Sequence, residues 1–426
     1  MPMPDRLRDE IAARRDDLVA LTQALVRIPT VNPPGEFYRE ACELVADRLR
    51  PQGFDCRFLR AEGAPGDSDR HPRWNLLARR EGARPGQCVQ FNGHIDVVEA
   101  GQGWTVDPFG GALIDGRIYG RGACDMKGGL AAAIVAVEAF LALVPDFPGA
   151  IEITATADEE TGGYGGVAFL AGQGLYARVD HVIIPEPLNK DRVCLGHRGV
   201  WWAEVETFGR IAHGSMPFLG DCAIRHMGAI VAEMEATLIP ALALKRTAMP
   251  VVPEGARAST VNINSIHGGQ AEQPAGSSGL PSPVVPDRCR MVIDRRFLAE
   301  ERLEDVKAEL TATIELAQDR RRFRAEVRDL FEVQPTMTDR DAPVAAALAR
   351  AVARVLGREA EFVVSPGTYD QKHVDRIGRL SNCVAYGPGI LDLAHQPDEY
   401  VGVDDMLDAA LVMALALGDL LGHDRA

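Results

Sequence analysis

The stretch Cys88-Val89-Gln90-Phe91-Asn92-Gly93-His94-Ile95-Asp96 decides the fold class of this 426-residue chain. Its first part is typical of a short buried strand, and Gly93 interrupts it, so we expect His94 at the carboxyl end of that strand. Residues two apart in an extended chain face the same side, which lets Asp96 orient the imidazole of His94. The stretch therefore predicts a buried strand that presents an oriented histidine at one edge of a sheet.

Two later apolar segments also end at acidic residues. Residues 151–157 run into an acidic turn that contains Glu159 and Glu160, and residues 181–184 are soon followed by Glu186. In an open α/β sheet, ligands bind outside the carboxyl ends of the strands. We therefore expect three segments that are far apart in the sequence to bring acids and an imidazole to one rim of the sheet.

Two more positions add the same chemistry. Asp125 lies in the glycine-rich segment 120–129, before a helix-like run at 130–143, and His395 lies far downstream in a loop. Carboxylate and imidazole groups are natural ligands of Zn²⁺, Mn²⁺ and Co²⁺, and two such ions can activate a water for hydrolysis. Each residue alone has a structural explanation, such as a solvated surface acid or a strand-end histidine. Together they indicate a site for two divalent metal ions.

Length and composition favour a two-domain enzyme of the cytoplasm. The chain exceeds the usual span of one hydrophobic core, and its hydrophobic content of 46% can fill a sizeable interior. We find neither an unbroken apolar window of about 20 residues nor a signal-peptide core, which predicts no membrane partner. A net charge of −15 argues against a nucleic-acid surface. The eight scattered cysteines are expected to be reduced core residues.

The order of the elements predicts one domain inserted into another. Residues 5–30 and 37–52 carry the helical spacing of apolar positions. Strand and helix patterns then alternate up to about residue 198 and resume late in the chain. This predicts a discontinuous α/β catalytic domain, residues 1–198 and 332–426, with a mainly parallel sheet flanked by helices. Residues 199–331 follow the order βαββαβ, which is typical of a ferredoxin-like α+β domain. Its expected strands are 199–208, 258–266, 288–297 and 323–331, and its expected helices are 221–238 and 301–316.

Four motifs of this chain resemble those of the M20 metallopeptidases. They are Gly93-His94-Ile95-Asp96-Val97-Val98, the segment 120–129, Asp158-Glu159-Glu160 and Glu186-Pro187. They occur in the family's order across nearly the whole chain. They are most similar to the acetylornithine deacetylase and succinyl-diaminopimelate desuccinylase branch.

The resemblance implies a role for each candidate residue. One ion would be held by His94 and Glu186, the other by Glu160 and His395, with Asp125 between them and Asp96 as the partner of His94. His395 is preferred to His373 mainly by the family pattern. Glu159 would be the general base, because the attacking water must lose a proton that finally reaches the departing amine nitrogen.

Two residues of the inserted domain complete the implied site. His213 matches a lid histidine that stabilises the oxyanion in the partner subunit's active site in related dimers, which implies a homodimer formed through a lid/dimerisation domain. Arg296 matches a lid arginine that binds the substrate carboxylate, a task suited to a planar guanidinium group. A loop histidine or a surface ion pair is the structural alternative for these two, and Arg295 is close enough to confuse the second assignment.

The chain departs from the branch at two places. Ser282-Pro283-Val284-Val285-Pro286 stands where relatives often carry an asparagine, and Gly367-Thr368-Tyr369-Asp370-Gln371-Lys372-His373 replaces a familiar substrate-bordering loop. The acyl-group preference is therefore open.

We expect a hydrolase with two metal ions, zinc before cobalt or manganese, that cleaves the amide of a small N-acyl amino acid or related N-acylated amine. A dipeptidase or a hydrolase of another C–N bond is the nearest alternative. A metal-binding interaction protein without turnover is the alternative from a different class.

Overall fold

The computed structural model describes residues 2–269 and 282–422, and the chain forms two compact units. The first unit comprises Met1–Gly196, Met337–Val363 and Tyr369–Ala426, and the second comprises His197–Thr336 and Val364–Thr368. The predicted use of these segments as a catalytic domain and a lid/dimerisation domain remains a proposal.

A nine-stranded sheet organises the first unit, with strand order β1-β2-β6-β3-β7-β15-β8-β13 and β14 paired to β8. The strands are β1 (Asp55–Arg60), β2 (Trp74–Glu81), β3 (Arg84–His94), β6 (Pro148–Thr156), β7 (His181–Ile184), β8 (Arg192–His197), β13 (Thr336–Met337), β14 (Glu361–Ser365) and β15 (Cys383–Ala385). The central strands β6, β3, β7 and β15 run parallel, whereas β2 joins β6, and β8 joins β15, in antiparallel fashion. The predicted α/β class with a mostly parallel central sheet is confirmed.

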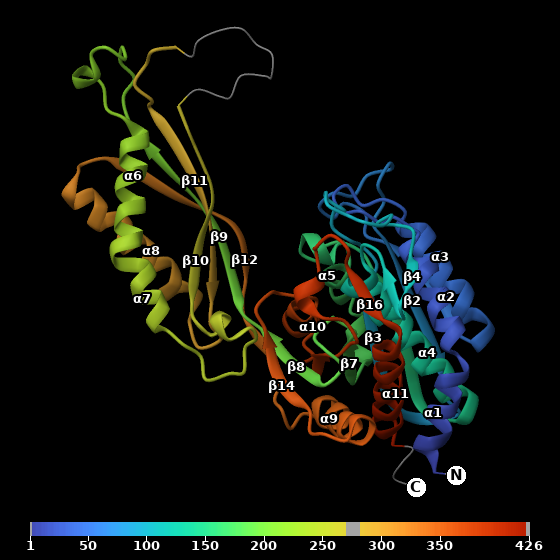
Figure 1. Ribbon diagram of the computed structural model, residues 1–426. Coiled ribbons are helices and arrows are strands. Elements are labelled where there is room, and N and C mark those ends of the chain that lie inside the picture. The colour runs from blue at the N-terminus through green and yellow to red at the C-terminus, as the bar shows by residue number, and fades with distance from the viewer. Residues whose placement is uncertain (1, 270–281, 423–426) are drawn as a thin grey trace. The chain divides into compact units, whose positions relative to one another are not determined.

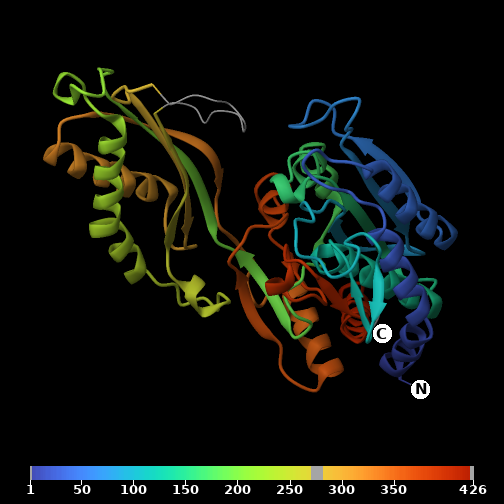
Figure 2. The same cartoon turned by 45° about the horizontal axis from the view of Figure 1, so that its top comes forward.

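Helices cover this sheet, as Figures 1 and 2 show. They are α1 (Met3–Ala13), α2 (Arg15–Val26), α3 (Tyr38–Leu49), α4 (Gly128–Leu143), α5 (Val167–Gly172), α9 (Pro343–Leu356), α10 (Gln371–Arg376) and α11 (Val403–Leu420). A small sheet of order β16-β5-β4 is formed by β4 (Ala112–Ile114), β5 (Arg117–Tyr119) and β16 (Tyr400–Gly402). The amino-terminal helical pattern, expected as one run over residues 5–30, is divided at Arg14, whose backbone angles (φ −96°, ψ 11°) are not helical.

The core of the first unit lies around α4. This helix is apolar on all sides, and its residues from Gly128 to Leu141 are buried, because α1, α2, α11 and β3 pack around it. By length and composition alone, Ala123–Leu143 and Ala223–Leu244 could each cross a membrane. The apolar window of the first is 89% buried inside the protein, which is the behaviour of a core helix.

The second unit is a four-stranded antiparallel sheet with helices on one side (Figures 1 and 2). Its strands are β9 (Gly199–Phe208), β10 (Thr260–Gly268), β11 (Arg288–Phe297) and β12 (Arg324–Val333), in the order β10-β11-β9-β12. Its helices are α6 (Ala223–Glu233), continued by η6 (Met234–Leu238) and α7 (Ile239–Leu244), and α8 (Leu303–Arg320). Alternate residues of β9 and β11 are buried against these helices, as a sheet with one covered face requires. The βαββαβ order is thus confirmed.

Candidate metal centre

His94 occupies the last position of β3 and is buried. Its Nδ1 lies 3.0 Å from the main-chain oxygen of Asp96 and 3.5 Å from the carboxylate Oδ1 of the same residue. Its Nε2 lies 3.1 Å from Oδ1 of Asp125 and 3.9 Å from Oε1 of Glu186. One ring nitrogen is therefore held by Asp96 and the other faces two carboxylates, as in a metal-ligating imidazole with an orienting partner.

The carboxylates that meet His94 come from two different elements. Glu186 follows β7 by two residues and is buried. Asp125 lies within η2 (Ala123–Lys127), where its backbone is extended (φ −117°, ψ 96°) between helical segments. Three separate parts of the chain therefore contribute to one cluster at the carboxyl ends of β3 and β7.

Glu160 and His395 form a second cluster with Asp125. Glu160 lies in η3 (Glu159–Thr161) after β6, and its Oε2 is 3.1 Å from Nε2 of His395. The same Nε2 is 3.6 Å from Oδ2 of Asp125. Because His94 faces Oδ1 of Asp125 and His395 faces Oδ2, Asp125 joins the two clusters.

The donor atoms suit two divalent cations. Ligand atoms within each of two groups, His94 with Asp125 and Glu186, and Asp125 with Glu160 and His395, lie within 4.8 Å of one another. Three carboxylates and two imidazoles are the nitrogen and oxygen donors that zinc, cobalt and manganese accept. The five residues that the sequence predicts as ligands thus lie together, with Asp125 common to both groups.

The clustered acids strongly perturb one another. Burial raises the pKa of Glu160 to about 7 and raises the pKa of Glu186 well above its ordinary value. Burial acts in the same direction on Asp125, but the contact with His94 lowers the pKa of that carboxyl below its usual range. The pKa of His395 rises to about 9 because of its contact with Glu160. Burial disfavours the ionised form of these carboxyl groups. Bound cations would stabilise that ionised form.

Asp96 supports the acidic turn as well as His94. It is buried, and its Oδ1 and Oδ2 accept hydrogen bonds from the backbone N–H groups of Glu159 and Glu160, at 3.1 Å each. The amide of Asn32 also donates to Oδ2 at 3.0 Å. The carboxylate of Asp96 therefore holds the turn that follows β6 by hydrogen bonds and also lies against Nδ1 of His94, whose nearer contact is the main-chain oxygen of Asp96.

The adjacent residues Glu159 and Glu160 point to different partners. Glu160 contacts His395, whereas Oε1 of Glu159 accepts a hydrogen bond from Nζ of Lys372 at 3.1 Å. Glu160 therefore belongs to one of the two candidate ligand groups and Glu159 to neither, which is the separation that the predicted general-base role of Glu159 requires.

Sequence reasoning missed two residues that support this centre. Glu399 is fully buried, and its Oε1 accepts the backbone N–H groups of Cys124 and Asp125, at 2.9 and 3.0 Å, while Oε2 pairs with Arg121. Its signal was its place four residues after His395. Lys372 lies in the segment 367–373, and its charge among residues that are otherwise buried was the available signal.

His373, the histidine that was not chosen as a ligand, has a structural role. Its Nε2 donates to the carbonyl of Gly162 at 2.6 Å, and its ring packs against Tyr164 with centroids 5.6 Å apart. Burial, with Lys372 nearby, lowers the pKa of His373 to about 4.

The other two predicted site residues lie in the second unit. His213 is exposed, and its Nδ1 accepts hydrogen bonds from the backbone N–H and the hydroxyl of Ser215, at 3.1 and 2.7 Å, which leaves Nε2 to carry the proton. The departing segment packs beside it, since Gly214 donates to the carbonyl of Pro283 at 2.5 Å. A substrate role for either segment remains a proposal.

The two neighbouring arginines face opposite sides of the sheet. Arg295 is buried and pairs with Glu301 at 3.0 Å and Glu309 at 3.3 Å on the helix side. Arg296 is half-buried, and its fork is held by both carboxylate oxygens of Asp294, at 2.7 and 2.9 Å. Arg296 therefore stays the better candidate for a substrate carboxylate, although Asp294 already occupies its fork.

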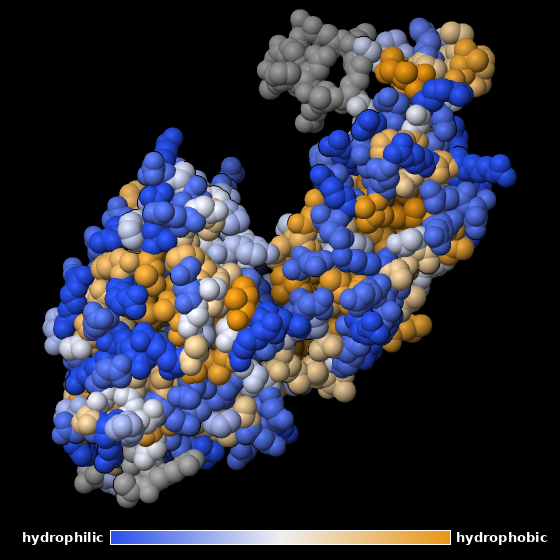
Figure 3. All heavy atoms as spheres, turned by 180° about the vertical axis from the view of Figure 1, so that it is seen from behind, coloured by the Kyte–Doolittle hydropathy of each residue, from blue (hydrophilic) through white to orange (hydrophobic). Residues whose placement is uncertain are grey.

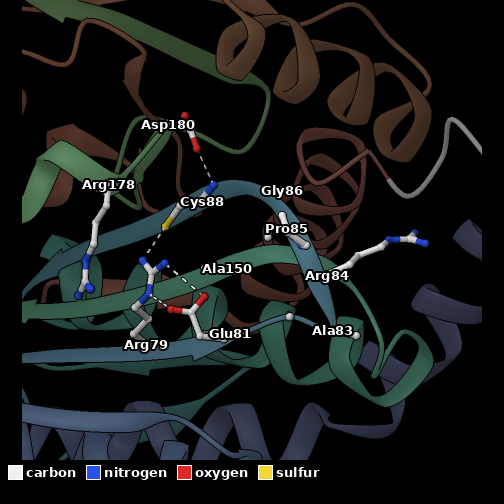
Figure 4. A pocket seen from close by; sticks show the side chains of 12 residues that line it. Arg79, Glu81, Ala83, Arg84, Pro85, Gly86, Cys88, Ala150, Arg178 and Asp180 are labelled. Carbon is white, nitrogen blue, oxygen red and sulfur yellow. Dashed lines mark hydrogen bonds and ion pairs between the residues drawn. The ribbon is translucent and has the colours of Figure 1, made fainter.

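A separate pocket lies near the amino-terminal part of β3, at the end of that strand opposite His94 (Figure 4). In Figure 4, the guanidinium of Arg79 donates hydrogen bonds to Glu81 and to the sulfur of Cys88, and the backbone N–H of Cys88 donates to the carboxylate of Asp180. Arg79 also pairs with the buried Glu152 at 2.7 Å. Three arginines and only two acids line this pocket, and among the described residues none of its acids belongs to a group that could hold a metal ion.

Comparisons with known proteins agree with this centre. Residues 90–419 match the model of peptidase family M20/M25/M40. A succinyl-diaminopimelate desuccinylase of Methylobacterium radiotolerans is 31% identical over 407 residues, which cover 92% of this chain and 93% of that protein. Human carnosine dipeptidase 1 has the same fold, with a TM-score of 0.77, 21% identity and 99% of each chain covered. A Bacillus subtilis protein described as a dinuclear metal-binding peptidase of the M20 family has a TM-score of 0.67 at 16% identity, over 96% of this chain and 99% of that one.

Proposed function

This chain belongs to peptidase family M20/M25/M40 and is a metal-dependent amidohydrolase, and from this premise we propose that its substrates are small N-acylated amino acids or related N-acylated amines. The observation that carries the proposal is the pair of ligand groups that share Asp125, next to a glutamate that belongs to neither group. The desuccinylase similar to this chain is named for removing a succinyl group from such a substrate.

We propose that the two groups hold two zinc ions, with cobalt or manganese as substitutes. The nitrogen and oxygen donor set fits these ions. When bound, the ions would activate a water and polarise the carbonyl of the scissile amide.

The protein's own residues then move the proton. Glu159 would take it from the attacking water and deliver it to the amine nitrogen that leaves, so that the amide C–N bond breaks and a carboxylate and a free amine form. Asp96 supports this step because it holds the backbone of Glu159 through Oδ1. Arg296 and His213 are proposed to bind the substrate carboxylate and the oxyanion.

A substrate panel tests the proposal. N-acetyl, N-succinyl and N-formyl amino acids are assayed beside dipeptides, with Zn²⁺, Co²⁺ or Mn²⁺ supplied. We expect N-acylated amino acids to be hydrolysed, and Glu159→Gln to lower kcat about 10²- to 10⁴-fold while metal content is unchanged. Glu43→Gln, a half-exposed glutamate on α3, is the matched control. Turnover of dipeptides alone would transfer the assignment to a dipeptidase, and no turnover at all would favour the inactive metal-binding protein.

We further propose a cytoplasmic homodimer formed through the second unit. Apolar patches lie on the surface of that unit (Figure 3). Apolar residues around His213 are strongly exposed, including Ile211 at 59%, Phe218 at 77% and Leu219 at 55%. Such a patch is typical of a protein–protein contact.

Mixing inactive variants tests the dimer and the role of His213 together. His213→Ala and Glu159→Ala subunits are combined after each has been shown to be inactive, and the molar mass is measured by light scattering. Recovery of activity in a dimeric mixture is the expected result. A monomer, or a dimer without recovery, would contradict a site completed by the partner subunit's His213.

A further inference from the structure

Residues 369–373 form a rigid support beneath the turn that carries Glu159. Gln371 anchors this segment, because its Nε2 donates to the carbonyls of Leu195 and Cys383, at 3.0 and 2.7 Å, and its Oε1 accepts from the hydroxyl of Tyr369 at 2.5 Å. Leu195 belongs to β8 and Cys383 to β15, so the segment is fixed to the central sheet.

The same segment packs tightly against the turn after β6. His373 donates to the carbonyl of Gly162. Gly163 has φ +76°, and a Cβ there would approach Oδ1 of Asp370 to 2.8 Å and Nε2 of His373 to 3.1 Å. The contact leaves room only for glycine, so the turn and the segment are held as one packed piece.

Lys372 lies at the centre of this contact. Its side chain is 3% exposed, and its ammonium donates to Oε1 of Glu159, whose side chain is 10% exposed. Asp370, also buried, keeps Oδ2 bonded to Asn92 at 3.1 Å, while its Oδ1 has no hydrogen-bond partner among the described residues. Burial alone would lower the pKa of Lys372, but Glu159 and Asp370 raise it above its ordinary value.

A buried ammonium is costly unless an opposite charge pairs with it in good geometry, and here Glu159 accepts its hydrogen bond. The contact uses only Oε1 of Glu159, and a carboxylate has a second oxygen that can accept a proton. Without the contact, the glutamate side chain would gain rotamers, and a displacement of about 1 Å can cost about 10²-fold in rate.

We propose that Lys372 is a positioning residue that holds the carboxylate of Glu159 in its working orientation through the ion pair between Nζ and Oε1. The inference rests on the proposed function, because Glu159 must act as the general base for its orientation to matter. It also assigns a function to the segment 367–373, for which the sequence alone predicts none.

The test measures kcat and KM of the metal-loaded enzyme for Lys372→Met, Lys372→Arg, Glu159→Gln and the double variant Glu159→Gln with Lys372→Met. We expect Lys372→Met to lower kcat about 10- to 100-fold with KM changed less than about threefold. Lys372→Arg, which keeps a cation, should recover most of kcat. In the Glu159→Gln background, Lys372→Met should have little further effect, because the residue acts through Glu159.

Other outcomes would overturn the proposal. A raised KM with unchanged kcat would make Lys372 a substrate-binding residue. An equal loss of kcat in both backgrounds would make its role structural. Arg48→Met is the matched control, since it also removes a cation from a buried carboxylate of the same unit, Glu138, at 2.6 Å. It should lower stability without lowering kcat.

A crystallographic readout keeps this proposal separate from the proposed function. If the wild-type protein hydrolyses no amide in the panel, the proposed function fails whatever the orientation of Glu159. Crystal structures of metal-loaded wild type and Lys372→Met then decide the ion pair itself. A reoriented or disordered Glu159 carboxylate in the variant supports positioning by Lys372, and an unchanged carboxylate overturns it.

Discussion

Replacing Asp96 with asparagine should weaken both the fold and the metal centre. The carboxylate accepts two backbone N–H groups and the Asn32 amide in a fully buried site. Asparagine offers one oxygen and places an NH₂ group against the remaining donors. A buried donor without an acceptor costs about 1–3 kcal/mol.

Part of this cost is offset by relief of charge repulsion. The pKa of Asp158 is raised to about 6, first by burial and second by the negative charge of Asp96. Asparagine removes that charge. We therefore expect a net loss of about 1–2 kcal/mol in the free energy of unfolding of the metal-free protein.

The substitution should lower metal affinity more than it lowers stability. The carboxylate of Asp96 contacts Nδ1 of His94 at 3.5 Å and accepts the backbone N–H of Glu160, and these two residues are one proposed ligand of each ion. Loss of such an outer partner usually lowers metal affinity about 10- to 100-fold.

Chelator competition measures the affinity, and urea unfolding of the metal-free protein measures the stability. Asp69→Asn, at a fully exposed carboxylate, is the control and should match wild type in both. An Asp96→Asn variant with wild-type affinity and stability would refute the coupling of His94 and the acidic turn through one carboxylate.

Three further predictions follow from the same contacts. Glu399→Gln leaves the buried Arg121 without its carboxylate, so we expect a loss of about 3–5 kcal/mol in the free energy of unfolding and weaker metal binding. Urea unfolding and chelator competition measure the two effects, and wild-type values in both would contradict this prediction. Because the pKa of His373 falls from 6.5 to about 4 on folding, its contribution is complete above pH 6.5 and is lost as the pH falls toward 4, by at most about 3 kcal/mol. His373→Gln should flatten this part of the stability curve, and an identical slope in the variant would speak against it. Removing metal ions should lower the midpoint of thermal unfolding, because a ligand at about 100 times its Kd adds about 2.7 kcal/mol to the free energy of unfolding. Equal midpoints with and without chelator would contradict metal binding by the folded protein.

Local patterns predicted the elements that they mark most strongly. The strands Gly199–Phe208, Arg288–Phe297 and His181–Ile184 have the expected bounds, because alternation or an unbroken apolar run marks a strand directly. The division at Arg14 was missed, since the apolar spacing on its two sides continues a single helical pattern. The antiparallel edges of the first sheet depend on which strands become neighbours, and local sequence does not carry that information.

The candidate site divides in the same way. The metal-ligand candidates could be named because each ends an apolar run or lies in a family motif, and the structure brings them together. The residues that hold these candidates in place could not be predicted. The contacts of Lys372 with Glu159 and of Glu399 with Asp125 join residues that are 213 and 274 positions apart. Sequence spacing reports such pairs only when both residues lie in one element.

Anomalous X-ray scattering from crystals of the metal-replenished protein tests the central claim most directly. We expect two peaks per chain, one among His94, Asp125 and Glu186 and the other among Asp125, Glu160 and His395. A single peak, or peaks away from Asp125, would contradict it.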